Sequence, residues 1–183
     1  EAGAPAIPTL WPDDPGGADI AAAFDHFGCD DLVIKRRVGA GAEGQLRFTR
    51  ETAPPADWRY GHRAMVQPFL PEIVADGETS FLFVDGQFSH AVRKTAAPGD
   101  YRIQSIYGGQ EQAITPPAGD IAAARAVIEA IPGETPLYAR VDMIRQGDAL
   151  AVMEVELIEP YLYPRQGPRL GEMLAQAVLK RLS

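Results

Sequence analysis

Three acidic side chains in the second half of the chain have residue types and spacing that could support chemistry. Asp142 lies in a run of β-branched and apolar residues, 138–145, while Glu154 and Glu156 lie in a second such run, 150–158. The short segment between the runs contains a glycine and an aspartate, which favour a tight reversal of the chain. The pattern therefore predicts a β-hairpin that carries all three carboxylates.

The register of this hairpin decides whether the carboxylates meet. If the loop spans residues 147–149, Asp142 lies opposite Glu154 and Arg140 lies opposite Glu156, with Cβ atoms about 5 Å apart. Like charges placed opposite each other destabilise a sheet, so the acidic groups need a compensating cation. Clustered hard oxygen ligands suit Mg²⁺, which substrate phosphates commonly complete. The alternative is a solvent-exposed strand face that Arg140 neutralises.

The opposite face of the same hairpin is apolar, because successive strand residues point to opposite sides of a sheet. It comprises Val141, Met143, Met153, Val155 and Leu157. Amphipathic patterns predict helices over residues 120–130, with Asp120 as the cap, and 170–182. We expect both helices to cover this apolar face.

A glycine-rich segment follows the predicted strand 32–38, which contains Lys35. Its glycines match the G-x-G-x-x-G pattern of dinucleotide sites, but such a turn must open a helix. Residues 45–50 instead alternate like a strand and precede Pro54-Pro55. We therefore interpret the segment as a flap whose backbone N–H groups cradle phosphates, with Lys35 supplying positive charge. The alternative is a mobile hairpin turn and a solvated lysine.

Composition narrows the class of protein. The 183 residues are 46% hydrophobic and 23% charged, as in a folded soluble protein, and the net charge of −8 argues against nucleic acid as a partner. No apolar segment approaches the ~20 residues that span a membrane. A single cysteine, Cys29, fits a cytoplasmic protein. The lack of an initial methionine and the Pro/Gly-rich start suggest a fragment or a processed chain.

The middle of the chain adds positive charge. Asp85-Gly86 predicts a second hairpin turn, and a long polar loop follows it, which we interpret as functional. Arg93, Lys94 and Arg102 lie in or near this loop. They are suited to hold anionic substrate groups; the alternative is a set of surface ion pairs.

These motifs occur in one order: lysine strand, glycine flap, the connector MVQPFL, a GDYR loop that ends in GG, and a D…MEVE hairpin. In this the chain resembles the ATP-grasp superfamily of carboxylate-amine ligases, especially glutathione synthetase and the enzymes that add glutamate to a ribosomal protein. The resemblance implies an α+β fold of two lobes whose antiparallel sheets sandwich the nucleotide. We expect a small lobe over residues 1–66 and a C-terminal lobe over 67–183.

The resemblance also implies roles for individual residues, with ATP and Mg²⁺ as cofactors. Lys35 and the flap would contact the phosphates, Gln67 the adenine amino group, and Glu78 the ribose. Arg102 would steady an acyl phosphate. The implied nucleotide contacts are Val33, Lys35, Gly41, Gly44, Gln67, Phe69, Leu70, Glu78 and Met153, and the implied magnesium ligands are Asp142, Glu154 and Glu156.

The chain departs from the family pattern in places. Glu156 stands where asparagine is usual and Gln104 where asparagine is common. From the resemblance we expect the family's first domain to belong upstream of Glu1, so that this chain would be a fragment lacking it. We expect an ATP-dependent carboxylate-amine ligase that forms a C–N bond through an acyl phosphate. Its partners would be small-molecule carboxylates and amines, without nucleic acid or membrane, and a homodimer is compatible. The alternatives are a non-catalytic ATP-binding module and a dinucleotide-binding protein, the latter excluded if no helix follows Gly44.

Overall fold

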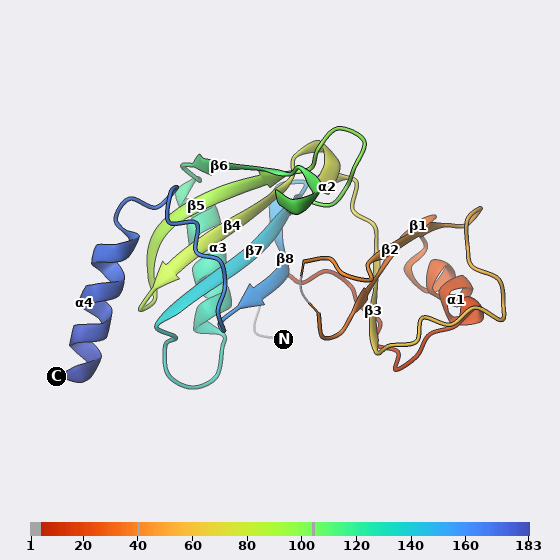
Figure 1. Cartoon of the computed structure of the whole chain (residues 1–183), viewed down its shortest axis with the longest axis horizontal. Coiled ribbons are helices and arrows are strands. Elements are labelled where there is room, and N and C mark those ends of the chain that lie inside the picture. The colour runs from red at the N-terminus through yellow and green to blue at the C-terminus, as the bar shows by residue number, and fades with distance from the viewer. Residues whose placement is uncertain (1–4, 40, 104) are drawn as a thin grey trace. The chain divides into compact units, whose positions relative to one another are not determined.

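The computed structural model describes residues 5–39, 41–103 and 105–183, which form two compact units (Figure 1). The smaller unit is Ile7–Pro71, and the larger contains Glu72–Ser183 together with Pro5 and Ala6. Each unit has its own antiparallel sheet, so the expected α+β class with two antiparallel sheets is confirmed. No helix in the described part of the chain is long and apolar enough to cross a membrane.

The smaller unit is a three-stranded sheet covered on one face by a helix. Its elements are α1 (Gly17–Phe27), β1 (Asp31–Arg36), β2 (Leu46–Thr49) and β3 (Ala64–Pro68), with strand order β2-β1-β3. Alternation along β1 sends Leu32 and Ile34 into a core with Ile20 and Phe24 of α1. Val33 and Lys35 consequently point to the face away from the helix.

Local signals explain where α1 begins and ends. The helix begins at Gly17, and the Asp19 carboxylate accepts a hydrogen bond from the Gly16 N–H at 2.7 Å. Asp19, the third residue of the helix, thus provides an acceptor for the Gly16 N–H, which has no partner within the helix. Gly28 ends the helix with φ of 62°, a left-handed conformation that glycine adopts without strain.

The larger unit is a five-stranded sheet of order β6-β5-β4-β7-β8. Its strands are β4 (Glu78–Val84), β5 (Gln87–Thr95), β6 (Gln110–Ile114), β7 (Tyr138–Gln146) and β8 (Ala149–Glu156). Its helices are α2 (Glu72–Ala75), the 3-10 turn η1 (Ser105–Tyr107), α3 (Ala118–Glu129) and α4 (Leu170–Leu182). The predicted hairpins at Asp85-Gly86 and between β7 and β8 are both present, and part of the long polar loop forms β6.

The β7–β8 hairpin reaches the expected register by an unexpected route. Its turn contains two residues, Gly147-Asp148, rather than three, which by itself would displace every later pair by one position. A β-bulge between Asp142 and Met143 restores the alignment, because β8 contributes one extra residue there, Met153. Asp142 therefore pairs with Glu154, as the sequence indicated.

The bulge also changes what the hairpin buries. Val152, Val155 and Leu157 pack on the core of the larger unit, and Met153, which we expected there, is absent from that core among the described residues. Met153 is the bulged residue of β8 and lies outside this core, so this expectation was wrong.

The two long helices of the larger unit lie at different places on its sheet: α3 covers one face, whereas α4 lies beside the end of the sheet where β4 finishes (Figure 1). Ala124 and Ile128 of α3 pack on Phe81 and Phe83, whereas α4 packs on Val84, which points the other way along β4. Our expectation that both helices cover one face was therefore wrong for α4. The carboxylates lie on the face opposite α3.

Candidate functional site

Three carboxylates gather on the sheet face opposite α3. One oxygen from each of Asp142, Glu154 and Glu156 lies within 4.8 Å of the others. The antiparallel register brings Asp142 and Glu154 opposite each other and places Glu156 two residues farther along β8. The hairpin therefore positions the acidic cluster much as its sequence pattern predicted.

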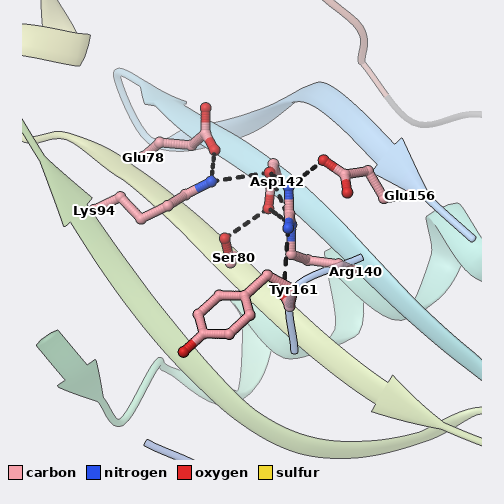
Figure 2. Close-up of polar contacts among 7 residues, drawn as sticks. All are labelled: Glu78, Ser80, Lys94, Arg140, Asp142, Glu156 and Tyr161. Atoms are coloured by element: carbon pink, nitrogen blue, oxygen red, sulfur yellow. Dashed lines mark hydrogen bonds and ion pairs between the residues drawn. The ribbon is translucent and has the colours of Figure 1, made fainter. Parts of the chain in front are cut away.

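Two cations lie among these carboxylates (Figure 2). The Lys94 Nζ is 2.9 Å from Asp142 Oδ2, and the Arg140 Nη2 is 3.0 Å from the same oxygen. Arg140 also pairs with Glu156, and the Ser80 hydroxyl donates to Asp142 Oδ1 at 2.6 Å. Both oxygens of Asp142 are thus engaged by neighbours on three different strands.

This face is not the solvated surface that the simpler alternative predicts. Asp142 is 1% exposed and Arg140 is 8% exposed. Arg140 does neutralise carboxylates, as that alternative requires, but it does so inside the protein. Charges are rarely buried unless they are paired, so this is a built polar network.

Burial and the two cations set the charge of the network. Burial alone would raise the pKa of Asp142, but Lys94, Arg140 and the Ser80 hydroxyl hold that pKa below its usual value. Burial raises the pKa of Glu156, against the opposing effect of Arg140. Burial opposes the charge of Lys94 as well, yet Glu78 and Asp142 raise its pKa. Asp142 is therefore a carboxylate and Lys94 an ammonium near neutral pH.

The donor set fits Mg²⁺. All three groups offer hard carboxylate oxygens, and Glu154 is exposed, so one side of the cluster is accessible to an ion and to substrate phosphates. The magnesium ligands that the sequence suggested are thus close enough to share one ion. Their binding of it is a proposal taken up below.

Glu78 belongs to the same network. It begins β4, is 6% exposed and forms an ion pair with Lys94. Burial raises the pKa of Glu78 to about 7, a rise that Lys94 only partly offsets. Lys94 therefore contacts both Glu78, the implied ribose ligand, and Asp142, an implied metal ligand.

In the smaller unit, the register gathers several of the implied nucleotide contacts. Val33 pairs with Gln67, and Lys35 pairs with Met65, so these side chains share the sheet face away from α1. Gln67 is 7% exposed, and its amide nitrogen donates to the Thr9 hydroxyl at 2.9 Å.

Thr9 determines which end of the Gln67 amide is available. The Thr9 hydroxyl donates its proton to the Ile7 carbonyl oxygen at 2.8 Å, so it can only accept from Gln67. The amide nitrogen of Gln67 therefore faces Thr9, which leaves the amide oxygen as the group that Gln67 can offer to a ligand.

The connector after Gln67 contributes mainly backbone groups. The Phe69 N–H donates to the Asp31 carbonyl at 2.9 Å, which ties the connector to β1. The Arg47 guanidinium stacks on the Phe69 ring at 3.6 Å from its centroid. Leu70 follows directly and is half-buried.

The glycine-rich segment is a strand-to-strand turn. Gly41 and Gly44 have φ of 63° and 71°, and the Gly44 carbonyl accepts a hydrogen bond from the Tyr60 hydroxyl at 2.7 Å. A Cβ on Gly44 would lie 2.8 Å from Arg36 Nε. Ala40 lies outside the described residues. Because β2 rather than a helix follows, the dinucleotide-binding alternative is excluded.

Arg102 lies in the loop between β5 and β6. Its guanidinium binds Asp100 through Nε at 3.0 Å and Nη2 at 2.7 Å, and it stacks on Tyr107 at 3.8 Å from the ring centroid. Bidentate hydrogen bonds to Arg102 lower the pKa of Asp100. The neighbouring Gln104, another departure from the family pattern, lies outside the described residues.

Sequence reasoning missed the partners of the implied ligands. In the sequence, Lys94 was recognised only as one of several cations. The signal that could have distinguished it is its position two residues after Val92 on β5, which places both side chains on the sheet face opposite α3. Arg93, grouped with it, points to the other face. No local pattern distinguishes Ser80 or Thr9, whose importance depends on contacts across the fold.

Comparison with known proteins identifies similar chains, although no family model matches. The chain is 29% identical over 197 residues to the cycloserine biosynthesis protein DcsG of Streptomyces lavendulae, covering 98% of this chain and 66% of that protein. The crystal structure of D-cycloserine synthetase DcsG is similar with a TM-score of 0.85 and 25% identity, over 100% of this chain and 67% of that one.

Two further structures share the fold. The ATP-grasp ligase PsnB, complexed with Mg and ADP, is similar with a TM-score of 0.70 and 17% identity, over 98% of this chain and 54% of that one. D-alanine–D-alanine ligase from Bacillus anthracis, complexed with ATP, is similar with a TM-score of 0.65 and 18% identity, over 97% of this chain and 62% of that one.

The chain thus spans about two thirds of the length of the curated relative. Its two antiparallel sheets and its likeness to these structures show that it has the fold of the ATP-grasp ligases.

Proposed function

We propose that the protein is an ATP-dependent ligase that joins a carboxylate to an amine, forming a C–N bond through an acyl phosphate. The observation that carries the proposal is the cluster of Asp142, Glu154 and Glu156 beside two buried cations. Such a cluster suits a phosphoryl-transfer site, where positioning and charge stabilisation supply most of the rate. The likeness to ligases in complex with ATP, or with ADP and Mg, supports the same reaction.

Asp142, Glu154 and Glu156 would hold Mg²⁺. The chemistry that Mg²⁺ would supply there is to offset the negative charge that develops on phosphate oxygens during the reaction. Arg140 lies against two of these carboxylates and keeps their charge balanced within the protein. Glu156, where the family usually has asparagine, adds a negative charge that Arg140 partly neutralises.

The smaller unit would supply nucleotide contacts. Lys35 and the turn around Gly41 and Gly44 would bind phosphates through a point charge and backbone N–H groups. Gln67 would accept a hydrogen bond from the adenine amino group, since Thr9 leaves its oxygen available. Other contacts would come from Val33, from the Phe69 carbonyl and from the Leu70 backbone.

The larger unit would complete the contacts to the substrates. Glu78 would bind the ribose with the carboxylate oxygen that does not contact Lys94. Met153 would contact the adenine, a role that its displacement from the core by the bulge supports. Arg102 would exchange Asp100 for the acyl phosphate, which offers the same bidentate oxygen geometry.

We also propose the class of substrate. Similar proteins are named for D-cycloserine and for D-alanine, and others are complexed with precursor peptides. D-Alanine and peptides both carry carboxylate and amine groups, so we propose amino-acid-like small molecules, a class that the name of the curated relative also indicates. A cytoplasmic location and a homodimer would fit the protein and stay as proposals.

Release of ADP tests the proposal. We expect the protein to release ADP from Mg-ATP only when a suitable acid and amine are both present. Glu154→Ala should abolish this release, because it removes the accessible metal ligand, whereas Glu129→Ala, an exposed position on α3, should leave it unchanged.

The same assay distinguishes the alternative. If the wild-type protein binds ATP but releases no ADP with any acid and amine in a broad amino-acid panel, it is a non-catalytic ATP-binding module. Full activity of Glu154→Ala would refute the metal assignment.

A further inference from the structure

Lys94 occupies an unusual place for a lysine. It is 7% exposed, it lies at the end of β5, and its ammonium group is enclosed by the central strands of the sheet. Lysines are almost never buried to this extent unless they are paired. Its position therefore depends on the groups that surround its nitrogen.

Those groups are two buried carboxylates from different strands. Lys94 Nζ forms an ion pair with Glu78 of β4 and lies 2.9 Å from Asp142 Oδ2 of β7 (Figure 2). Among the described residues, Lys94 is the cation in contact with both. Arg140 contacts Asp142 from the other side and extends to Glu156 instead.

The two carboxylates belong to different parts of the proposed site. Glu78 is the proposed ribose contact and Asp142 a proposed metal ligand. Both are almost fully buried, with 6% and 1% of their surface exposed, so solvent does little to screen one from the other. The ammonium group between them removes a repulsion that would otherwise turn one side chain away or protonate it.

We propose that Lys94 is a positioning residue that couples the nucleotide-binding Glu78 to the metal-binding Asp142, holding both carboxylates in the geometry that the ligand needs. This inference rests on the proposed function. Partners that orient a metal ligand typically change metal affinity by 10- to 100-fold when they are removed. Lys94 differs from such a partner because it also contacts Glu78, the proposed ribose ligand, and so connects the metal ligand Asp142 to the nucleotide site.

Binding of Mn²⁺, used in place of Mg²⁺ and followed by electron paramagnetic resonance, tests this without reference to turnover. We expect Lys94→Met to weaken Mn²⁺ about 10-fold or more. Binding of a non-hydrolysable ATP analogue should weaken in the same variant. Lys94→Arg, which keeps a cation in reach of both carboxylates, should recover part of both affinities.

Arg93→Met is the matched control. It removes one positive charge from the adjacent position of β5, but its side chain is exposed on the opposite face of the sheet. We expect it to bind Mn²⁺ and the ATP analogue as the wild type does. A loss caused only by net charge would appear in both variants.

The outcomes separate this inference from the proposed function. If the wild type binds Mn²⁺ and Asp142→Asn does not, but Lys94→Met binds as well as wild type, Lys94 has no positioning role and the metal site stands. If the wild type binds no Mn²⁺ even with the ATP analogue, both proposals fail.

Circular dichroism establishes whether Lys94→Met folds. If it does not, the double variant Lys94→Met/Glu78→Gln removes one charge of each sign and serves in its place. The double variant still lacks the Lys94 ammonium group beside Asp142, although Arg140 remains, so we expect it to bind Mn²⁺ about 10-fold more weakly than Glu78→Gln alone. Equal affinities in these two variants would overturn the inference.

Discussion

Replacing Arg140 with methionine tests how the buried charges are balanced. Arg140 donates to Asp142 from Nε at 3.1 Å, pairs with Glu156, and donates to the Tyr161 carbonyl at 3.3 Å (Figure 2). Its side chain is only 10% exposed, so the variant leaves carboxylates with one cation fewer inside the protein.

The expected loss is large. Removing one partner of a buried ion pair costs about 3–5 kcal/mol, because the remaining charge is buried without compensation. We expect the low end, about 3 kcal/mol, since Lys94 and Ser80 still bind Asp142. The free energy of unfolding, measured by denaturant titration in EDTA, is the quantity to compare.

Two further variants identify the cause. Arg145 lies on the same strand as Arg140 and forms an ion pair with Asp120 of α3, which Arg145→Met breaks. The Arg145 side chain is 40% exposed, so we expect a loss of at most about 1 kcal/mol. Adding Glu156→Gln to Arg140→Met removes the unpaired charge and should recover about 1 kcal/mol of the loss, as coupled neighbours do.

Magnesium should also recover stability in Arg140→Met, because an ion that binds only the folded state stabilises it. We expect excess Mg²⁺ to raise the free energy of unfolding more in this variant than in wild type. Should Arg140→Met lose no more stability than Arg145→Met, the reasoning about buried charge compensation would be refuted.

The remaining predictions concern Glu78 and Thr9. Burial raises the pKa of Glu78 to about 7 in the folded protein from an ordinary value of 4.5. The protonated Glu78 side chain therefore contributes its full stability below about pH 4.5, and this contribution is lost as the pH rises toward 7. This difference between the two pKa values corresponds to at most about 3 kcal/mol. The free energy of unfolding of the wild type minus that of Glu78→Gln should therefore fall as the pH rises across this window. If that free-energy difference does not change with pH, the raised pKa of Glu78 is contradicted. Thr9→Val removes the acceptor that orients the Gln67 amide, so the amide can rotate and offer its nitrogen to a 6-oxo purine. We expect the ratio of ATP to GTP affinity to fall about tenfold, the effect of roughly one hydrogen bond, and an unchanged ratio would show that Gln67 does not read the base.

The sequence alone determined the features that depend on local pattern. Alternation in residues 138–158 established a hairpin with one apolar and one acidic face, because strand geometry separates neighbouring side chains. The strand-like residues after Gly44 excluded a dinucleotide turn. The order of these motifs indicated the ATP-grasp fold, which the two antiparallel sheets and the likeness to solved structures then confirmed.

Only the tertiary structure decided which groups meet. Lys94 and Asp142 are 48 positions apart, and Gln67 and Thr9 are 58 apart, so no local pattern relates them. The bulge at Met153 likewise depends on the partner strand, as two residues of β8 oppose one of β7. Periodicity along a chain determines which way each side chain points, whereas the contacts it makes depend on strands that only folding brings together.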